Sequence, residues 1–125
     1  MLKRYVDDII IFSPNAEEKI NPLDLPQTSV MKVAFEKALK ASMCCRDKGL
    51  IIAADTIVYL DKIMGKPKDE NEAYEMLSFL SGRTHYVFTG ICIMDMETLK
   101  KIVDYEKTEV VFNAYTQDFI KRYLS

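Results

Sequence analysis

One aspartate interrupts an otherwise apolar segment of this 125-residue chain. The segment from Leu50 to Leu60 reads LIIAADTIVYL, and Asp55 lies at its middle. A buried carboxylate lowers stability by several kcal/mol unless it is paired or binds a metal ion. Two interpretations of Asp55 stay open: it caps a neighbouring turn or helix, or it belongs to a ligand site at the end of a strand. In the second, its carboxylate takes a proton from water or holds a divalent cation.

Two polar groups near Asp55 in the sequence also have the chemistry for a nucleotide. Thr56 offers a hydroxyl on the opposite side of the same strand. Lys66 lies between Gly65, which frees the backbone, and Pro67, which stiffens it. A compact ammonium held in this way suits a phosphate oxygen, although a solvated loop lysine explains the pattern equally well. The Walker pattern G-x-x-x-x-G-K-[S/T] is absent from the sequence, which excludes a P-loop NTPase.

Other titratable residues give weaker signals. Lys37, taken by itself, is typical of a surface lysine on a helix, and His85, the only histidine, is typical of a satisfied structural residue. The three cysteines include an adjacent pair and match no disulfide framework or zinc-ligand spacing. Reduced thiols are therefore expected, and a redox or metal-thiolate function is disfavoured.

Composition limits the class of protein. The length predicts one domain over residues 1–125, and the 49% of hydrophobic residues are enough for a core. A net charge of −2 does not indicate the basic surface that binding of duplex nucleic acid requires. Because no apolar stretch approaches ~20 residues and no signal-peptide pattern occurs, we expect no membrane partner and a cytoplasmic location.

The remaining sequence predicts elements that alternate between strand and helix. Asp69 and Glu72 form a capping box at the start of a helix that Gly82 ends. The segment around Asp55 is predicted to be a central strand covered on both faces, and Gly90 marks a bulge or a close backbone approach. The pattern indicates an α/β domain with a mixed central sheet flanked by helices. The predicted strands are 8–12, 50–60, 63–64, 84–94 and 106–112, and the predicted helices are 28–46, 69–81 and 116–124.

Several motifs, in order along the chain, resemble one family. Ala34–Ala38 (AFEKA), Leu50–Val58 (LIIAADTIV), Gly65–Leu77 (GKPKDENEAYEML) and Leu80–Gly90 (LSGRTHYVFTG) resemble the Maf nucleotide pyrophosphatases, also called septum formation inhibitor Maf-like proteins. The resemblance implies an α/β fold related to the inosine triphosphate pyrophosphatases. It also implies hydrolysis of nucleoside triphosphates to monophosphate and pyrophosphate with a divalent metal cation, Mg²⁺ or Mn²⁺. The implied substrates are pyrimidine or modified nucleotides, and the implied role is nucleotide-pool cleansing or restraint of cell division.

The resemblance also implies roles for individual residues. Asp55 matches the family's catalytic aspartate, as proton acceptor or metal holder, and Thr56 matches a position linked to substrate choice. Lys37 and Lys66 match lysines that face the phosphates, and Glu17 or Glu18 matches a glutamate near the metal. The residues expected to support this site from the matching motifs are Gly65, Pro67, Arg83 and His85.

The match departs from the family pattern at three places. No S-x-R-R loop occurs, the family's base-reading glutamine has no counterpart before Ser125, and Ala53 replaces a usual glycine. The chain is therefore expected to lack the family's first strand and C-terminal strands. We expect the exposed edges to be covered in a homodimer. The competing hypothesis is a catalytically impaired remnant that binds nucleotide weakly or contacts a protein partner.

Overall fold

The computed structural model describes residues 21, 23–44 and 48–125. Within this part the chain forms a four-stranded sheet with three helices, in the order α1 (Pro26–Cys44), β1 (Leu50–Leu60), β2 (Lys62–Met64), α2 (Glu70–Leu80), β3 (Thr84–Asp95), β4 (Lys101–Val111) and α3 (Gln117–Leu124). The strand order is β2-β1-β3-β4, and each neighbouring pair is antiparallel. The predicted α/β class is confirmed at this level, whereas the described strands form an antiparallel rather than a mixed sheet.

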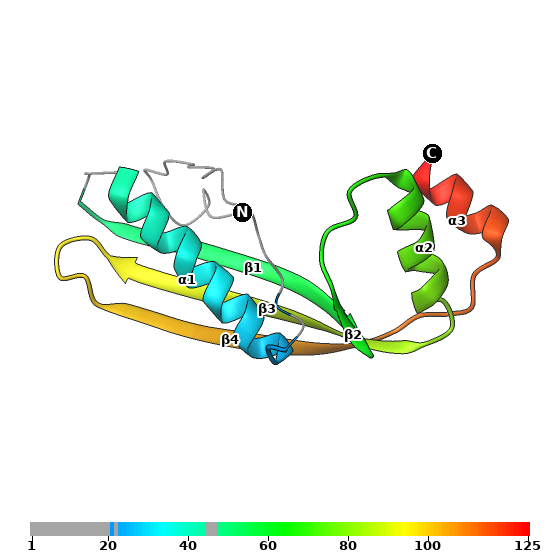
Figure 1. Ribbon diagram of the computed structural model, residues 1–125, viewed down its shortest axis with the longest axis horizontal. Helices are drawn as coiled ribbons and strands as arrows, with labels where there is room; N and C mark the ends of the chain where they lie inside the picture. The colour runs from blue at the N-terminus through cyan, green and yellow to red at the C-terminus, as the bar shows by residue number, and fades with distance from the viewer. Residues whose placement is uncertain (1–20, 22, 45–47) are drawn as a thin grey trace.

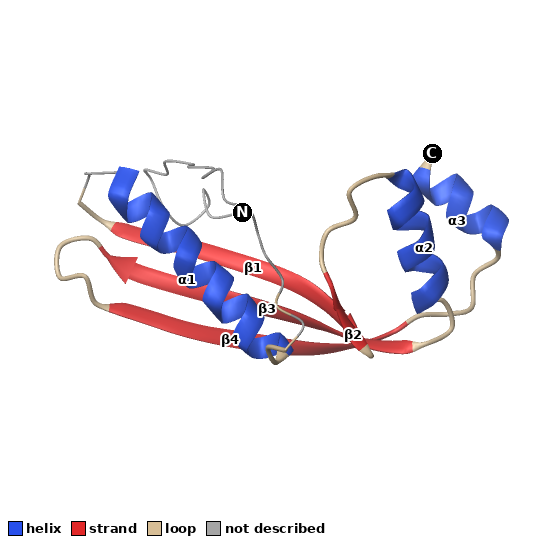
Figure 2. Cartoon of the chain, in the orientation of Figure 1, coloured by secondary structure: helices blue, strands red, loops and turns tan. Residues whose placement is uncertain are grey.

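The helices lie in two places. Helix α1 runs across one face of the sheet, while α2 and α3 lie side by side at one end of it, beyond β2 (Figures 1 and 2). The core between α1 and the sheet contains two clusters of buried side chains: Ala34, Ala38, Cys92 and Met94 in one, and Val30, Ile57 and Phe88 in the other. At the far end, Leu80 of α2 and Ile120 of α3 are buried.

The prediction that β1 is covered on both faces is wrong. Burial alternates along the strand, so Asp55 and Ile57 are buried while Ala54 and Thr56 are exposed, and Ile52 is 49% exposed. Among the described elements only α1 covers a face of the sheet (Figure 1), because antiparallel neighbours need no crossover helix on the other side. An apolar run therefore does not by itself identify a strand with two covered faces.

Most predicted boundaries hold to within a few residues. Helix α1 spans Pro26–Cys44 and so begins before the predicted Thr28; residues 45 and 46 of the predicted helix lie outside the described part. Strand β4 is longer than predicted because it starts at Lys101 instead of Glu106. The predicted strand 8–12 also lies outside the described residues. The predicted strand 63–64 is confirmed as β2, the short return strand of a hairpin with β1 whose turn holds Asp61 in the left-handed region at φ 61°.

The capping of α2 is confirmed with one change of partner. Asp69 accepts a hydrogen bond from the backbone N–H of Glu72 at 2.8 Å, and the Glu72 carboxylate accepts from the N–H of Lys68 instead of that of Asp69. Helix α2 ends at Leu80, and Gly82 follows in the left-handed region at φ 68°. Thr116 caps α3 by accepting from the N–H of Phe119 at 3.1 Å.

Replacing Asp69 by alanine is expected to lower the free energy of unfolding by about 1 kcal/mol, because the N–H of Glu72 loses its acceptor. Urea denaturation of the two proteins measures the difference. Asn71→Ala, an exposed change in the same helical turn, is the matched control and should cause no loss. Equal midpoints for the wild type and Asp69→Ala would contradict the assigned cap.

Candidate active site

Asp55 lies on the covered face of β1, under α1. Its residue exposure is 6%, and it is directly opposite Gly90 of β3 in the register. The strand places Asp55 on this face because side chains alternate, and the neighbouring Ile57 on the same side joins the core. A carboxylate at such depth requires a compensating charge or hydrogen bonds.

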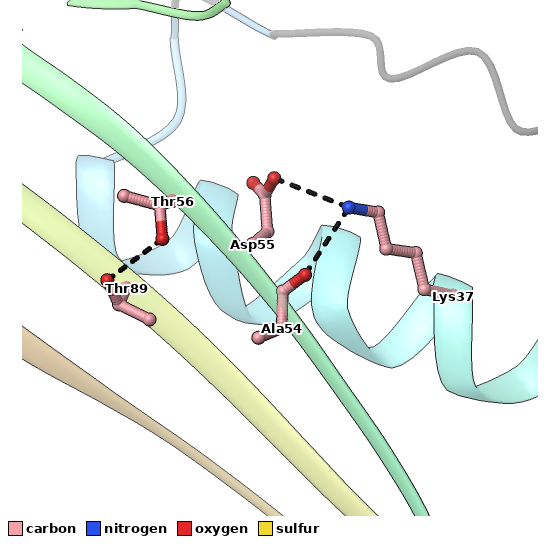
Figure 3. Close-up of polar contacts among 5 residues, drawn as sticks. All are labelled: Lys37, Ala54, Asp55, Thr56 and Thr89. Atoms are coloured by element: carbon pink, nitrogen blue, oxygen red, sulfur yellow. Dashed lines mark hydrogen bonds and ion pairs between the residues drawn. The ribbon is translucent and has the colours of Figure 1, made fainter. Parts of the chain in front are cut away.

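Lys37 of α1 supplies that charge. Its ammonium lies 3.7 Å from Asp55 Oδ1 and donates a hydrogen bond to the carbonyl oxygen of Ala54 at 3.3 Å (Figure 3). The Lys37 side chain is only 23% exposed, so its interpretation as an ordinary surface lysine is wrong. The family resemblance brings Lys37 and Asp55 to one site, and the structure places their charged groups in contact. The contacts of Lys37 thus fix it to β1 at the position of Asp55.

Thr56 points away from Asp55, as alternation along the strand predicts. Its hydroxyl lies 3.0 Å from that of Thr89, its cross-strand partner on β3 (Figure 3). Thr89 in turn is paired with Glu106 of β4, so a polar row crosses the uncovered face of the sheet. Asp55 and Thr56 are adjacent in sequence but face opposite sides of the sheet.

The Gly65-Lys66-Pro67 segment forms a second part of the candidate site. These residues follow β2 and line a pocket of about 480 Å³ between the hairpin and α2. Asp55 and Lys37 are not among the residues that line it. The structure therefore brings Lys37 to Asp55 but places Lys66 in a separate pocket.

The sequence reasoning missed Lys62, which lines the same pocket as Lys66. The Lys62 ammonium lies 5.4 Å from the centre of the Phe79 ring, and the Arg83 guanidinium lies 4.8 Å from it. Cation–π contacts of this kind hold cations beside an aromatic face. Arg83 thus contacts α2. The sequence feature that could have pointed to Lys62 is its spacing of four residues from Lys66, across β2.

His85 lies on the face of the sheet opposite to Asp55 and Tyr86. It is 2% exposed, and its ring packs edge-on against Phe112 at 4.6 Å between centroids. The prediction of a structural histidine agrees with this burial, but the prediction that it is satisfied is wrong for Nδ1, which has no hydrogen-bond partner in the described structure. Burial lowers the pKa of His85 below its ordinary value of 6.5, and the nearby backbone of Arg83 opposes this pKa shift.

This burial predicts a pH dependence of stability. Because the folded pKa is below the unfolded one, the unfolded chain binds the proton first as the pH falls. The stabilisation from the neutral ring is complete above the unfolded pKa of 6.5 and is lost as the pH falls below it. We expect the free energy of unfolding to fall more steeply on acidification than in His85→Phe, by up to about 1.4 kcal/mol per pH unit. Urea denaturation at several pH values checks this, and parallel curves would contradict it.

The described residues do not form a metal site on their own. In residues 21, 23–44 and 48–125, no group of three or more His, Cys, Asp or Glu side chains is placed to hold a metal ion. Glu17 and Glu18, the other predicted ligands, lie outside the described residues. Asp55 is the one predicted metal ligand among the described residues, and the Lys37 ammonium lies beside it.

No described helix is long and apolar enough to cross a bilayer.

Comparison with known proteins identifies the family. The model of the Maf-like protein family matches residues 1–125. A dTTP/UTP pyrophosphatase of Alkaliphilus oremlandii is 44% identical over 115 residues, which cover 91% of this chain and 59% of that protein. One of Caldanaerobacter subterraneus is 41% identical, with 88% of this chain and 54% of the relative covered. One of Clostridium acetobutylicum is 36% identical, with 100% and 68% covered.

The chain spans little more than half the length of the first two relatives. The family match itself includes the segments that carry Lys37, Asp55 and Lys66. The chain therefore belongs to the family of Maf-like proteins.

Proposed function

We propose that this chain carries the catalytic core of a nucleoside triphosphate pyrophosphatase that acts on dTTP and UTP. The supporting observation is the Lys37–Asp55 pair, a buried carboxylate held by an ammonium at the centre of the family's motifs. The names of the relatives supply the substrate class, since each is a dTTP/UTP pyrophosphatase. The family's α/β fold related to inosine triphosphate pyrophosphatases is part of the same proposal.

In the proposed reaction, water attacks the α-phosphorus and the bond to the bridging oxygen of the β-phosphate breaks. The products are a nucleoside monophosphate and pyrophosphate. Asp55 accepts the proton of the attacking water. Lys66 offsets the negative charge that develops on the phosphate oxygens, while Lys37 compensates the charge of Asp55 and orients its carboxylate.

A nucleotide panel tests the proposal. The protein is incubated with dTTP, UTP, CTP, ATP and GTP, and monophosphate and pyrophosphate are measured separately. We expect release of both products, fastest with dTTP and UTP. Release of inorganic phosphate with a diphosphate would indicate the wrong bond, and no release with any nucleotide would overturn the proposal.

The proposed activity depends on Mg²⁺ or Mn²⁺, as in the family. The described residues alone do not provide the ligands, so the proposal needs Glu17 or Glu18 together with Asp55. Activity that persists in excess EDTA would contradict this dependence. We also propose that the protein acts in the cytoplasm, where its exposed Cys44 stays reduced.

One surface favours self-association. On the uncovered face of the sheet, Ile52, Ile93 and Ile102 lie in one cross-strand row, and Ile102 is 68% exposed. An exposed apolar row of this kind typically marks an interaction surface. We propose that it contacts the same row of a second copy in a homodimer. Light scattering should then give twice the 14.4 kDa chain mass for the wild type and the single mass for Ile102→Lys, whereas a wild-type monomer would contradict the dimer.

The same row would also serve the alternative function, a nucleotide-binding or protein-interaction remnant without catalysis. Calorimetry separates the two. Binding of dTTP without hydrolysis supports the remnant, whereas binding followed by pyrophosphate release supports the enzyme.

A further inference from the structure

Helix α1 comes very close to the sheet at Gly90. A Cβ atom built on Gly90 would collide with the carbonyl group of Val30 and would lie 2.7 Å from the backbone nitrogen of Met31. Ordinary van der Waals contacts begin near 3.4 Å, so no other residue fits here unless the helix moves. The obstacle is the backbone of α1, which cannot rotate away as a side chain can. Gly90 also continues the β3 register without interruption, so the predicted close approach is confirmed and the alternative of a bulge is wrong.

The position of this contact relates it to the candidate site. Gly90 is the cross-strand partner of Asp55, so both lie at the same level of the sheet and face α1. Val30, which lies over Gly90, is two helical turns from Lys37 and on the same side of the helix as Ala34. Val30 and Ala34 are both fully buried against the sheet. The depth of α1 over Gly90 therefore sets how deeply Asp55 is covered and how close Lys37 lies to it.

We propose that Gly90 is a positioning residue for the reaction: its missing side chain lets α1 lie low enough for Lys37 to reach Asp55. The proposal rests on the proposed function for its kinetic consequences, but its structural consequence can be measured independently. A small further separation is enough to break the contact, because the Lys37 ammonium and Asp55 Oδ1 are already 3.7 Å apart. A methyl group at position 90 forces α1 away from the sheet and separates the pair.

The test compares the effect of Lys37→Met in two backgrounds. In the Gly90 protein we expect Lys37→Met to lower kcat/KM for dTTP about 100-fold, the size of effect seen when one charge-stabilising group is lost. In Gly90→Ala the Lys37–Asp55 pair is already separated. Lys37→Met should therefore lower kcat/KM less than about threefold in this background, since it removes no remaining ion pair. Equal losses in both backgrounds would overturn the proposal.

Two further variants separate positioning from loss of stability. Ile57→Ala removes buried volume from the same core without placing an atom between α1 and β3. It should lower the urea midpoint yet keep the full effect of Lys37→Met. Ala34→Val adds two methyl groups beneath the next turn of α1, and it replaces Gly90→Ala if that variant does not fold. If Ala34→Val keeps the full effect of Lys37→Met, the proposal fails.

An NMR measurement makes the result independent of activity. The carboxyl ¹³C shift of Asp55 is recorded with and without Lys37→Met in each background. We expect a clear change in the Gly90 protein and almost none in Gly90→Ala; equal changes in both would overturn the role of Gly90. If even the wild-type chain releases no pyrophosphate, the proposed function fails. The comparison of the Asp55 shifts still shows whether Gly90 controls the contact between Lys37 and Asp55.

Discussion

Replacing Asp55 by asparagine is expected to abolish pyrophosphate release, with kcat falling at least about 10³-fold. The reason is that asparagine keeps the size of the side chain but cannot accept a proton from water, and removal of a general base typically causes losses of 10²–10⁴-fold. The measurement is single-turnover release of pyrophosphate from dTTP. Binding of dTTP should change far less, because the lysines near the phosphates are retained.

Asp61→Asn is the matched control for this substitution. Asp61 is exposed, lies in the turn between β1 and β2, and adopts a left-handed conformation that asparagine tolerates well. The control should keep wild-type kcat. If Asp55→Asn keeps more than about a tenth of the wild-type rate, Asp55 is not the base.

Replacing Lys37 by methionine is expected to have the largest combined effect on activity and stability. Asp55 is 6% exposed, and methionine takes away the ammonium 3.7 Å from its carboxylate. Loss of one partner from a buried ion pair costs about 3–5 kcal/mol, and the 23% exposure of Lys37 places the expected loss at the lower end of this range. Urea denaturation measures this loss.

The double variant Lys37→Met/Asp55→Asn shows whether the loss comes from the pair. With both charges removed, no ionised group stays buried without its counter-charge, so much of the stability should return while activity stays absent. Lys40→Met on the same helix, at an exposed position, is the control and should change neither property. Additive losses in the double variant would contradict the ion pair.

Sequence patterns predicted the elements well because each had a local cause. Asp69 and Thr116 cap α2 and α3, the helices predicted to begin at these residues, and the alternation in β3 places His85 on the face opposite to Tyr86. The partner of Asp55 was harder to predict. Only the path of α1 across the sheet brings Lys37 to it, and that path depends on a glycine far along the chain.

Two errors have the same physical origin. The apolar run of β1 predicts a doubly covered strand, and Lys37 considered by itself is typical of a surface residue. Both properties depend on which surfaces pack against each other, and the sequence of a single segment carries no information about its neighbours. The family resemblance corrected the second error by grouping Lys37 with Asp55, whereas only the structure corrected the first.

The order of the strands also has a consequence for how the chain folds. Strands β3 and β4 are joined by a short turn and pair as a local hairpin, whereas β1 pairs with β3 from Tyr59↔Tyr86 to Leu50↔Asp95, with β2 and α2 lying between them in sequence. Closing that long loop costs conformational entropy before any β1–β3 contact forms. We therefore expect the β3–β4 hairpin to form early and the docking of β1 to limit the rate. The candidate site, which needs both β1 and α1, is thus expected to be assembled among the last parts of the molecule.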